Sequence, residues 1–137
     1  MDVILKHEPM TIPTYEPYAA NTLPFFLEKK AYQVPYTDRL SNKPVDKEYD
    51  SYTLENEHVK VVLLPELGGK IHGAVDKHNN YEFIYQNTVI KPAMVGIAGP
   101  WVSGGVEFNW PQHHRPTTFM PLEATPKKNA DGSVTVW

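Results

Sequence analysis

The sequence predicts an all-β, antiparallel fold of the sandwich type, for three reasons. Proline accounts for 13 of the 137 residues, against a usual share of about 5%, and proline interrupts helices. Short segments between residues 49 and 87 alternate apolar and polar side chains, which is the period of a half-buried strand. Glycine, asparagine and proline separate these segments, as turns do in a meander. We therefore expect no helical repeat array, and at most one or two helical turns, within residues 20–32 or 90–100.

Composition and charge narrow the class of protein. The length suits one domain, and hydrophobic and charged residues make up 41% and 21% of the chain, as in globular proteins. The net charge of −3 excludes a chain-wide basic surface for nucleic acid, and the lack of cysteine excludes disulfides and thiolate sites. No apolar run reaches the roughly 18 to 20 residues of a membrane span, and Asp2 stands where a signal peptide has cations. We expect a soluble, cytoplasmic protein without nucleic-acid or membrane partners.

Residues 1–48 form the first of two predicted regions, an extended arm rich in proline and aromatic residues. Residues 3–18 alternate apolar and polar side chains, with prolines at intervals that only extended or edge strands tolerate. Residues 24–50 carry aromatic side chains among charges and suit an arm that lies on a surface rather than in a core. These aromatic side chains need cover from the rest of the chain or from a second chain; they are Phe25, Phe26, Tyr32 and Tyr36.

Residues 49–137 form the second region, a partial β-sandwich domain that begins as an antiparallel meander. Val59, Val61 and Leu63 share one face of a predicted strand, and Asp131-Gly132 is typical of a hairpin turn. The expected turns are 56–58, 78–80 and 127–133, and the expected strands are 49–56, 58–66, 68–77, 81–87, 106–110, 117–125 and 133–137.

The sequence stops inside the second strand of a predicted hairpin, on the apolar residue Trp137. We expect the N-terminal piece of a longer domain; the alternative is a short protein whose final strand pairs at an edge. A sandwich cut there lacks partner strands and cover, so we expect self-association through exposed strand edges, most simply as a twofold dimer. The apolar face left open includes Val61, Leu63, Phe83, Phe119 and Val134.

Two motifs stand out from the strand pattern. In LLPELGGKI (residues 63–71), Gly68 and Gly69 let the backbone turn tightly between two strands, a structural role. In WVSGGVEFNWPQHHRPTTF (residues 101–119), flat indoles can stack on a sugar ring, and imidazole and guanidinium groups can donate hydrogen bonds to hydroxyls. A proline-rich connecting loop without function is the alternative. The candidate ligand-binding residues are Trp101, Glu107, Trp110, His113, His114 and Arg115, with Pro111 and Pro116 stiffening the loop.

Metal binding is the rival chemistry for the histidines. Imidazole and carboxylate groups are the usual ligand types, but no tight ligand spacing of the H-E-x-x-H kind occurs. We therefore expect no metal site and no cofactor. The side chains of a suitable ligand type are His72, His78, His113, His114 and Glu107, whereas His7 and His58 suit ordinary strand ends.

These motifs resemble the galactose mutarotase-like superfamily, which has the aldose 1-epimerase fold. LLPELGGKI is similar to an early turn of that superfamily, P-x-x-G-G-x-[IL], and SGGVEFNWPQHH is similar to the R-G-G-I-P-x-x-W-P stretch of hexose-6-phosphate mutarotases. The pattern GG-[IV]-E-F-N-W-P-x-H-H-R-P-T-T-F is typical of a mutarotase-like domain at the head of bacterial tetratricopeptide-repeat proteins. The resemblance covers roughly residues 49–137.

The resemblance implies a β-sandwich that binds carbohydrate in a cleft, where a histidine acts as acid and a glutamate as base. Gly104, Gly105, Trp110 and Pro111 match the mutarotase turn, and His114, or else His113, matches the first sugar-contacting histidine, which would be catalytic. Ser103 stands where the sugar-phosphate enzymes have arginine, which speaks against phosphate recognition. The second histidine and the base glutamate are expected beyond residue 137, and Glu107 is not a substitute for that base.

We therefore expect the carbohydrate-binding portion of a mutarotase-like protein. The longer protein would act on aldoses or glycans, and this chain alone would not be a complete enzyme. The alternative is a protein–protein interaction module of a repeat protein, in which the arm docks another chain and the histidine loop is structural.

Overall fold

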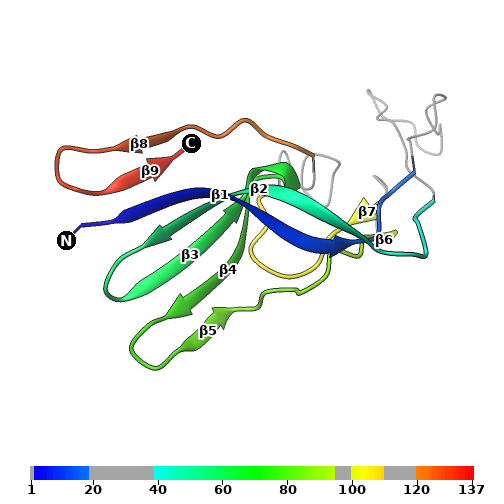
Figure 1. The fold of residues 1–137 in the computed structure, drawn as a ribbon, viewed down its shortest axis with the longest axis horizontal. Coiled ribbons are helices and arrows are strands. Elements are labelled where there is room, and N and C mark those ends of the chain that lie inside the picture. The colour runs from blue at the N-terminus through cyan, green and yellow to red at the C-terminus, as the bar shows by residue number, and fades with distance from the viewer. Residues whose placement is uncertain (1, 19–38, 95–99, 110–119) are drawn as a thin grey trace.

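A computed structural model of the chain describes residues 2–18, 39–94, 100–109 and 120–137. Its body is a five-stranded antiparallel sheet in which the strands follow one another in chain order (Figure 1). These strands are β1 (Ile4–Thr14), β2 (Val45–Glu55), β3 (Val59–Leu64), β4 (Lys70–Asp76) and β5 (Tyr81–Ile84).

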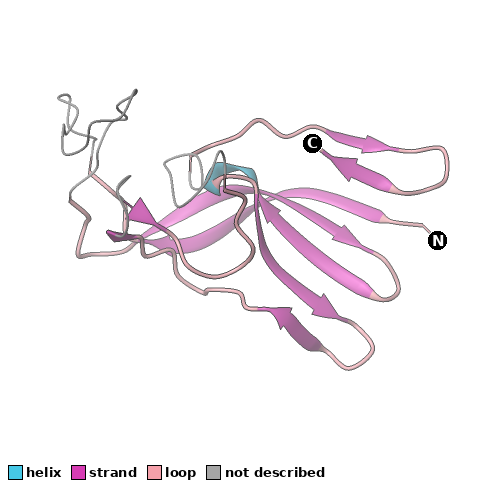
Figure 2. Ribbon diagram, turned by 180° about the vertical axis from the view of Figure 1, so that it is seen from behind, coloured by secondary structure: helices cyan, strands magenta, loops and turns pink. Residues whose placement is uncertain are grey.

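Two small hairpin-like pairs accompany the main sheet: β6 (Ala93–Met94) with β7 (Pro100–Trp101), and β8 (Pro126–Lys128) with β9 (Val134–Val136). Within the described ranges the helical structure is a single 3-10 turn, η1 (Pro65–Leu67), so strands dominate the regular structure (Figure 2). The prediction of an antiparallel all-β fold is confirmed. In the part of the chain that the structure describes, no helix is long and apolar enough to cross a membrane.

Strand β1 forms one edge of the sheet and pairs with β2 along its whole length, from Ile4 opposite Glu55 to Thr14 opposite Val45. An edge position tolerates Pro9 and Pro13, because one side of the strand needs no ladder partner. Both ends of the predicted arm, residues 4–14 and 45–48, thus belong to the sheet. The remainder of the arm that carries Phe25, Phe26, Tyr32 and Tyr36 lies outside the described residues.

The predicted meander is confirmed, since β2, β3, β4 and β5 pair in succession. Asn80 adopts a left-handed backbone, with φ of 54°, in the turn between β4 and β5, a conformation that asparagine tolerates better than most residues. The C-terminal hairpin also forms as expected, because Gly132 has φ of 86° and the Asp131 carboxylate accepts hydrogen bonds from the backbone and hydroxyl of Ser133.

Two predicted strands do not form in the described residues. Over 106–109 only Val106 is paired, through an isolated bridge to Ile71, and 120–125 contains no strand. Each segment is instead attached to the main sheet or to η1 by a few backbone hydrogen bonds. Residues 110–119, which include Phe119, lie outside the described part of the chain.

The hydrophobic core gathers on one face of the sheet, and its contribution from β3 is Leu64. Val62 and Leu64 are buried, whereas Val59, Val61 and Leu63 are half-buried. Leu63 lies on the other face of the sheet, which residues 120–125 and β9 cover in part. Both faces of β3 are therefore shielded from solvent near the end of the strand. The core cluster consists of Ile12, Tyr49, Leu64, Leu67, Ile90 and Val102.

Candidate functional site

The glycine loop, residues 101–108, continues the sheet beside β4 where β5 ends. Ile71 and Val106 exchange two backbone hydrogen bonds, of 3.1 and 2.8 Å, and Gly105 donates its backbone N–H to the carbonyl of Tyr85 at 2.7 Å. The Asn87 amide donates to the carbonyl and hydroxyl of Ser103, at 2.7 and 2.9 Å. The loop is therefore fixed to two neighbouring segments of the main sheet.

The backbone favours glycine at both central positions of this loop, and at Gly105 a side chain would also collide with the main chain. Gly104 and Gly105 have φ of 81° and 68°, in the left-handed region that side chains disfavour. A Cβ at Gly105 would lie 2.1 Å from the carbonyl oxygen of Ile71, and a Cβ at Gly104 would lie 2.8 Å from the Asn87 amide nitrogen. The double glycine thus permits the close approach of the loop to β4.

Trp101 and Glu107, two of the predicted ligand-binding residues, meet across the loop. The indole N–H of Trp101 donates to a carboxylate oxygen of Glu107 at 2.8 Å. Behind them, the ammonium of Lys70 donates to the carbonyl of Val102 at 3.0 Å, and Lys70 is only 2% exposed. Burial lowers the pKa of Lys70, and the negative charge of Glu107 partly opposes that shift. The loop therefore joins an indole, a carboxylate and a buried ammonium.

His72 follows Lys70 by two residues in β4, at the point where the pairing of β4 with β3 shifts register, and both side chains are buried. It is 3% exposed, and its Nε2 has no hydrogen-bond partner among the described residues. Burial, aided by the positive charge of Lys70, lowers the pKa of His72 to about 4. The imidazole is therefore neutral near pH 7.

The sequence indicates His72 only as a possible metal ligand and does not single out Lys70. A lysine after two glycines at the start of an apolar strand was the available signal. It does not reveal burial, because residues of the distant glycine loop cover the side chain.

The other predicted ligand-binding residues, with the proposed catalytic histidine His114, are outside the described part of the chain. Their role in ligand binding therefore stays a prediction. These residues are Trp110, His113, His114 and Arg115, and Pro111, predicted to stiffen the loop, is outside the described residues as well.

The first motif has a structural role in this fold. Gly68 ends η1 with φ of 71°, and its N–H donates to the carbonyl of Met120, while the N–H of Leu122 donates to the carbonyl of Pro65, both at 3.0 Å. A Cβ at Gly69 would lie 3.1 Å from a methyl carbon of Leu122. The turn therefore holds residues 120–124 against the sheet.

An apolar pocket of about 370 Å³ opens between this turn and the C-terminal strands. Aromatic and aliphatic side chains dominate its wall, so it suits an apolar group better than a hydroxylated one. It is lined by Leu63, Pro65, Gly68, Gly69, Ile71, Phe108, Leu122, Glu123, Ala124, Val136 and Trp137.

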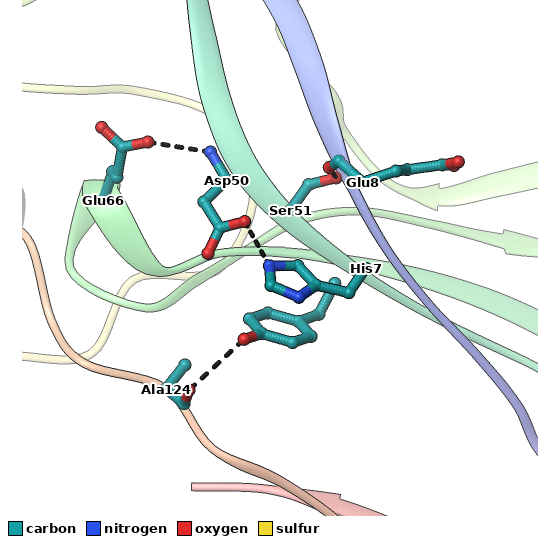
Figure 3. Close-up of polar contacts among 7 residues, drawn as sticks. His7, Glu8, Asp50, Ser51, Glu66 and Ala124 are labelled. Carbon is teal, nitrogen blue, oxygen red and sulfur yellow. Dashed lines mark hydrogen bonds and ion pairs between the residues drawn. The ribbon is translucent and has the colours of Figure 1, made fainter.

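A polar cluster that sequence reasoning missed joins β1, β2 and η1 (Figure 3). The imidazole of His7 is hydrogen-bonded to the Asp50 carboxylate and stacks on Tyr52, with ring centroids 4.2 Å apart. The backbone N–H of Asp50 donates to the Glu66 carboxylate at 2.8 Å, and Tyr52 donates to the carbonyl of Ala124 at 3.3 Å.

The adjacent Ser51 does not complete a nucleophilic triad with this histidine and aspartate. Its hydroxyl donates to the carbonyl of Glu8 at 2.7 Å, and the residue is 1% exposed. Successive residues of a strand point to opposite faces, so Ser51 is directed away from the face of Asp50. The cluster stabilises the edge of the sheet.

These features define an antiparallel all-β domain whose glycine loop is hydrogen-bonded to the main sheet. Residues 29–137 match the sequence model of the family described as Domain of unknown function (DUF5107). The chain belongs to this family.

A solved structure gives the same fold. The chain is similar to a TPR-domain containing protein from Parabacteroides distasonis ATCC 8503, with 29% identity and a TM-score of 0.82. The match covers 94% of this chain and 23% of that protein, so the chain spans less than a quarter of its length. The expected link to tetratricopeptide-repeat proteins is confirmed at this level, and the likeness to mutarotases stays a prediction.

Proposed function

We propose that this chain is a carbohydrate-binding domain, mutarotase-like in type, whose ligand binds beside the glycine loop. The observation that supports the proposal most is the hydrogen bond between the Trp101 indole and the Glu107 carboxylate, next to the buried ammonium of Lys70. Sugar sites combine a flat apolar surface with a few fixed polar groups. The resemblance of the loop to the mutarotase turn supports the same assignment.

The loop is suited to this task because its backbone is held in place before any ligand arrives. Hydrogen bonds to Ile71, Tyr85 and Asn87 anchor it, which reduces the entropy lost when a ligand binds. Ser103 offers a hydroxyl where the sugar-phosphate enzymes have arginine, so the proposed ligand is a neutral sugar. Trp110, His113, His114 and Arg115 follow within eight residues of Glu107 and are the remaining proposed contacts.

The direct test is a titration of the whole chain with neutral aldoses and with their 6-phosphates, followed by calorimetry and tryptophan fluorescence. We expect saturable binding of a neutral aldose, weaker binding of its phosphate, and at least tenfold weaker binding after Glu107→Gln. Glu57→Gln is the matched control, because Glu57 is an exposed carboxylate in the turn between β2 and β3. Absence of binding across the aldoses and a glycan array would overturn the proposal.

We further propose that His114 contacts the sugar, because the resemblance places it at the position of the first sugar-contacting histidine. His114→Ala should therefore weaken binding and leave the circular dichroism of the chain unchanged. Unchanged affinity in that variant would remove His114 from the site.

A protein–protein interaction module is the second candidate, and the apolar pocket favours it. Large apolar side chains are exposed around the pocket, among them Phe108 at 56%, Leu122 at 51% and Trp137 at 72%. Contiguous exposed apolar surface is typical of protein-binding sites. A stable oligomer together with no fluorescence response to any sugar would favour this candidate.

A further inference from the structure

Two histidines from neighbouring turns meet at one end of the main sheet. His58 closes the turn between β2 and β3, and His78 lies in the turn between β4 and β5. Nδ1 of His58 and Nε2 of His78 are 2.7 Å apart, and the ring centroids are 4.9 Å apart. The two turns therefore present one nitrogen each to a shared point, and this His58–His78 pair is independent of the glycine loop.

Lys77 connects the two turns by hydrogen bonds and so keeps the two imidazoles close to each other. Its backbone N–H donates to the carbonyl of His58 at 2.7 Å. Its ammonium donates to the Glu55 carboxylate at 2.6 Å and to the carbonyl of Asn56 at 2.8 Å. The hydrogen bond from Lys77 is also the main cause of the lowered pKa of Glu55, so this pair is charged at neutral pH.

One carboxylate contacts the imidazole of His58, and another contacts the backbone of His78. An oxygen of Glu57 lies 3.2 Å from Nε2 of His58, which favours a proton on that nitrogen and leaves the lone pair of Nδ1 directed at His78. The Asp76 carboxylate accepts the backbone N–H of His78 at 2.9 Å and holds the second turn. A carboxylate on the outer nitrogen of an imidazole is the arrangement that supports metal-binding histidines.

We infer that the His58–His78 pair binds a divalent transition-metal ion such as Zn²⁺ through Nδ1 of His58 and Nε2 of His78. Zinc–nitrogen bonds of about 2.0 to 2.1 Å in tetrahedral geometry place two ligand nitrogens about 3.3 Å apart. The two ligand nitrogens thus need to separate by only about 0.6 Å, and the His58 side chain is 44% exposed, so few packed side chains oppose this small shift. The ion takes the place of the proton that now joins the two rings.

Water completes the coordination of this ion. No group of three or more histidine, cysteine, aspartate or glutamate side chains arranged to hold a metal occurs within the described ranges. Two imidazoles with water bind an ion less tightly than the closed four-ligand sites that stabilise whole domains. The inference is therefore of an exchangeable surface ion, and the fold does not depend on it.

The test is calorimetric titration of the whole chain with ZnCl₂, combined with nitrogen NMR of the imidazole rings. We expect one ion per chain, shifts at Nδ1 of His58 and Nε2 of His78, and at least tenfold weaker binding after His58→Gln or His78→Gln. Glu57→Gln should weaken binding several-fold, because it removes the carboxylate that orients His58.

His7→Gln is the matched control, since His7 is also partly exposed but is paired with a carboxylate, Asp50, instead of a second imidazole. The double variant His113→Gln/His114→Gln tests the other histidines, and both controls should bind zinc as the unaltered chain does. Unchanged affinity in His78→Gln, or loss of binding only in the double variant, overturns the inference. Sugar binding by His58→Gln and His78→Gln should match that of the unaltered chain, whereas the double variant should weaken sugar binding and leave zinc binding unchanged. The zinc proposal and the sugar proposal therefore fail separately.

Discussion

Gly104 and Gly105 have the same left-handed backbone but different neighbours. Alanine substitutions at the two positions therefore separate the cost of the backbone conformation from the cost of a steric clash of the new Cβ. Alanine at either position carries a backbone cost of about 1 to 3 kcal/mol. At Gly104 the new Cβ meets the Asn87 side chain, which can rotate, whereas at Gly105 it meets the backbone carbonyl of Ile71. We expect Gly104→Ala to be tolerated and Gly105→Ala to detach the loop. Urea unfolding and the near-ultraviolet dichroism of Trp101 measure the difference, and equal effects would contradict the proposed docking.

His72 makes the stability of the fold depend on pH. Its pKa falls from 6.5 to about 4 on folding. Between these two pH values the imidazole is mostly protonated in the unfolded chain and mostly neutral in the folded chain. The free energy of unfolding is therefore unaffected by His72 above pH 6.5. It decreases as the pH falls below 6.5, and this decrease is complete below pH 4. The difference amounts to roughly 2 to 3 kcal/mol at pH 4.5.

We expect His72→Gln to reduce the loss of stability between pH 7 and pH 4.5 by that amount, because glutamine does not titrate. Urea unfolding at the two pH values gives the measurement. A variant with the same pH dependence as the unaltered chain would show that His72 gains a proton while folded.

The edge strand β1 is attached to β2 by a buried hydroxyl pair as well as by its backbone ladder. Thr14 donates to the carbonyl of Ile12 at 2.9 Å, so the Tyr49 hydroxyl, also 2.9 Å away, donates to Thr14. Burial is the main cause of the raised pKa of Tyr49.

Thr14→Val should destabilise the fold by about 1 to 3 kcal/mol, because it leaves the Tyr49 hydroxyl buried without its partner. In the double variant Thr14→Val/Tyr49→Phe the loss should be smaller than the sum of the two single losses, as expected for one shared interaction. Additive losses in a double-mutant cycle would show that the two hydroxyls act independently.

The strands that could be predicted are those specified by side-chain alternation and turn residues within a short stretch of sequence. Alternating side chains and turn residues such as Asn80 and Asp131-Gly132 specify the meander and the last hairpin. The pairing of Ile71 with Val106 joins residues 35 positions apart, and no local pattern encodes it. The burial of Lys70 and the cover on both faces of β3 depend on such distant segments. The sequence therefore points to Trp101 and Glu107 as candidate site residues but not to the buried side chains behind them.

For the whole molecule, we predict self-association through the exposed apolar surface near the pocket. Phe108, Leu122 and Trp137 are each more than half exposed, and each large apolar side chain left in water forgoes roughly 1.5 to 3 kcal/mol. A second copy can cover the same patch on both chains through a twofold axis.

Sedimentation at micromolar concentration should show a dimer that Phe108→Asp converts to monomer. Ile4→Asp is the control, because Ile4 is also 56% exposed but lies at the far end of β1. A folded monomer of the unaltered chain would contradict the prediction.

The reciprocal hydrogen bonds between Ile71 and Val106 provide a natural reporter of loop position. Each amide donates to the carbonyl of the other residue, so the two N–H groups are protected from solvent together or not at all. Amide hydrogen exchange should therefore give the same opening free energy at both positions, although one lies in β4 and the other in the glycine loop. A sugar that tightens the loop would slow both exchange rates equally, and Gly105→Ala would accelerate both, while the amides of the β1–β2 ladder keep their own rates.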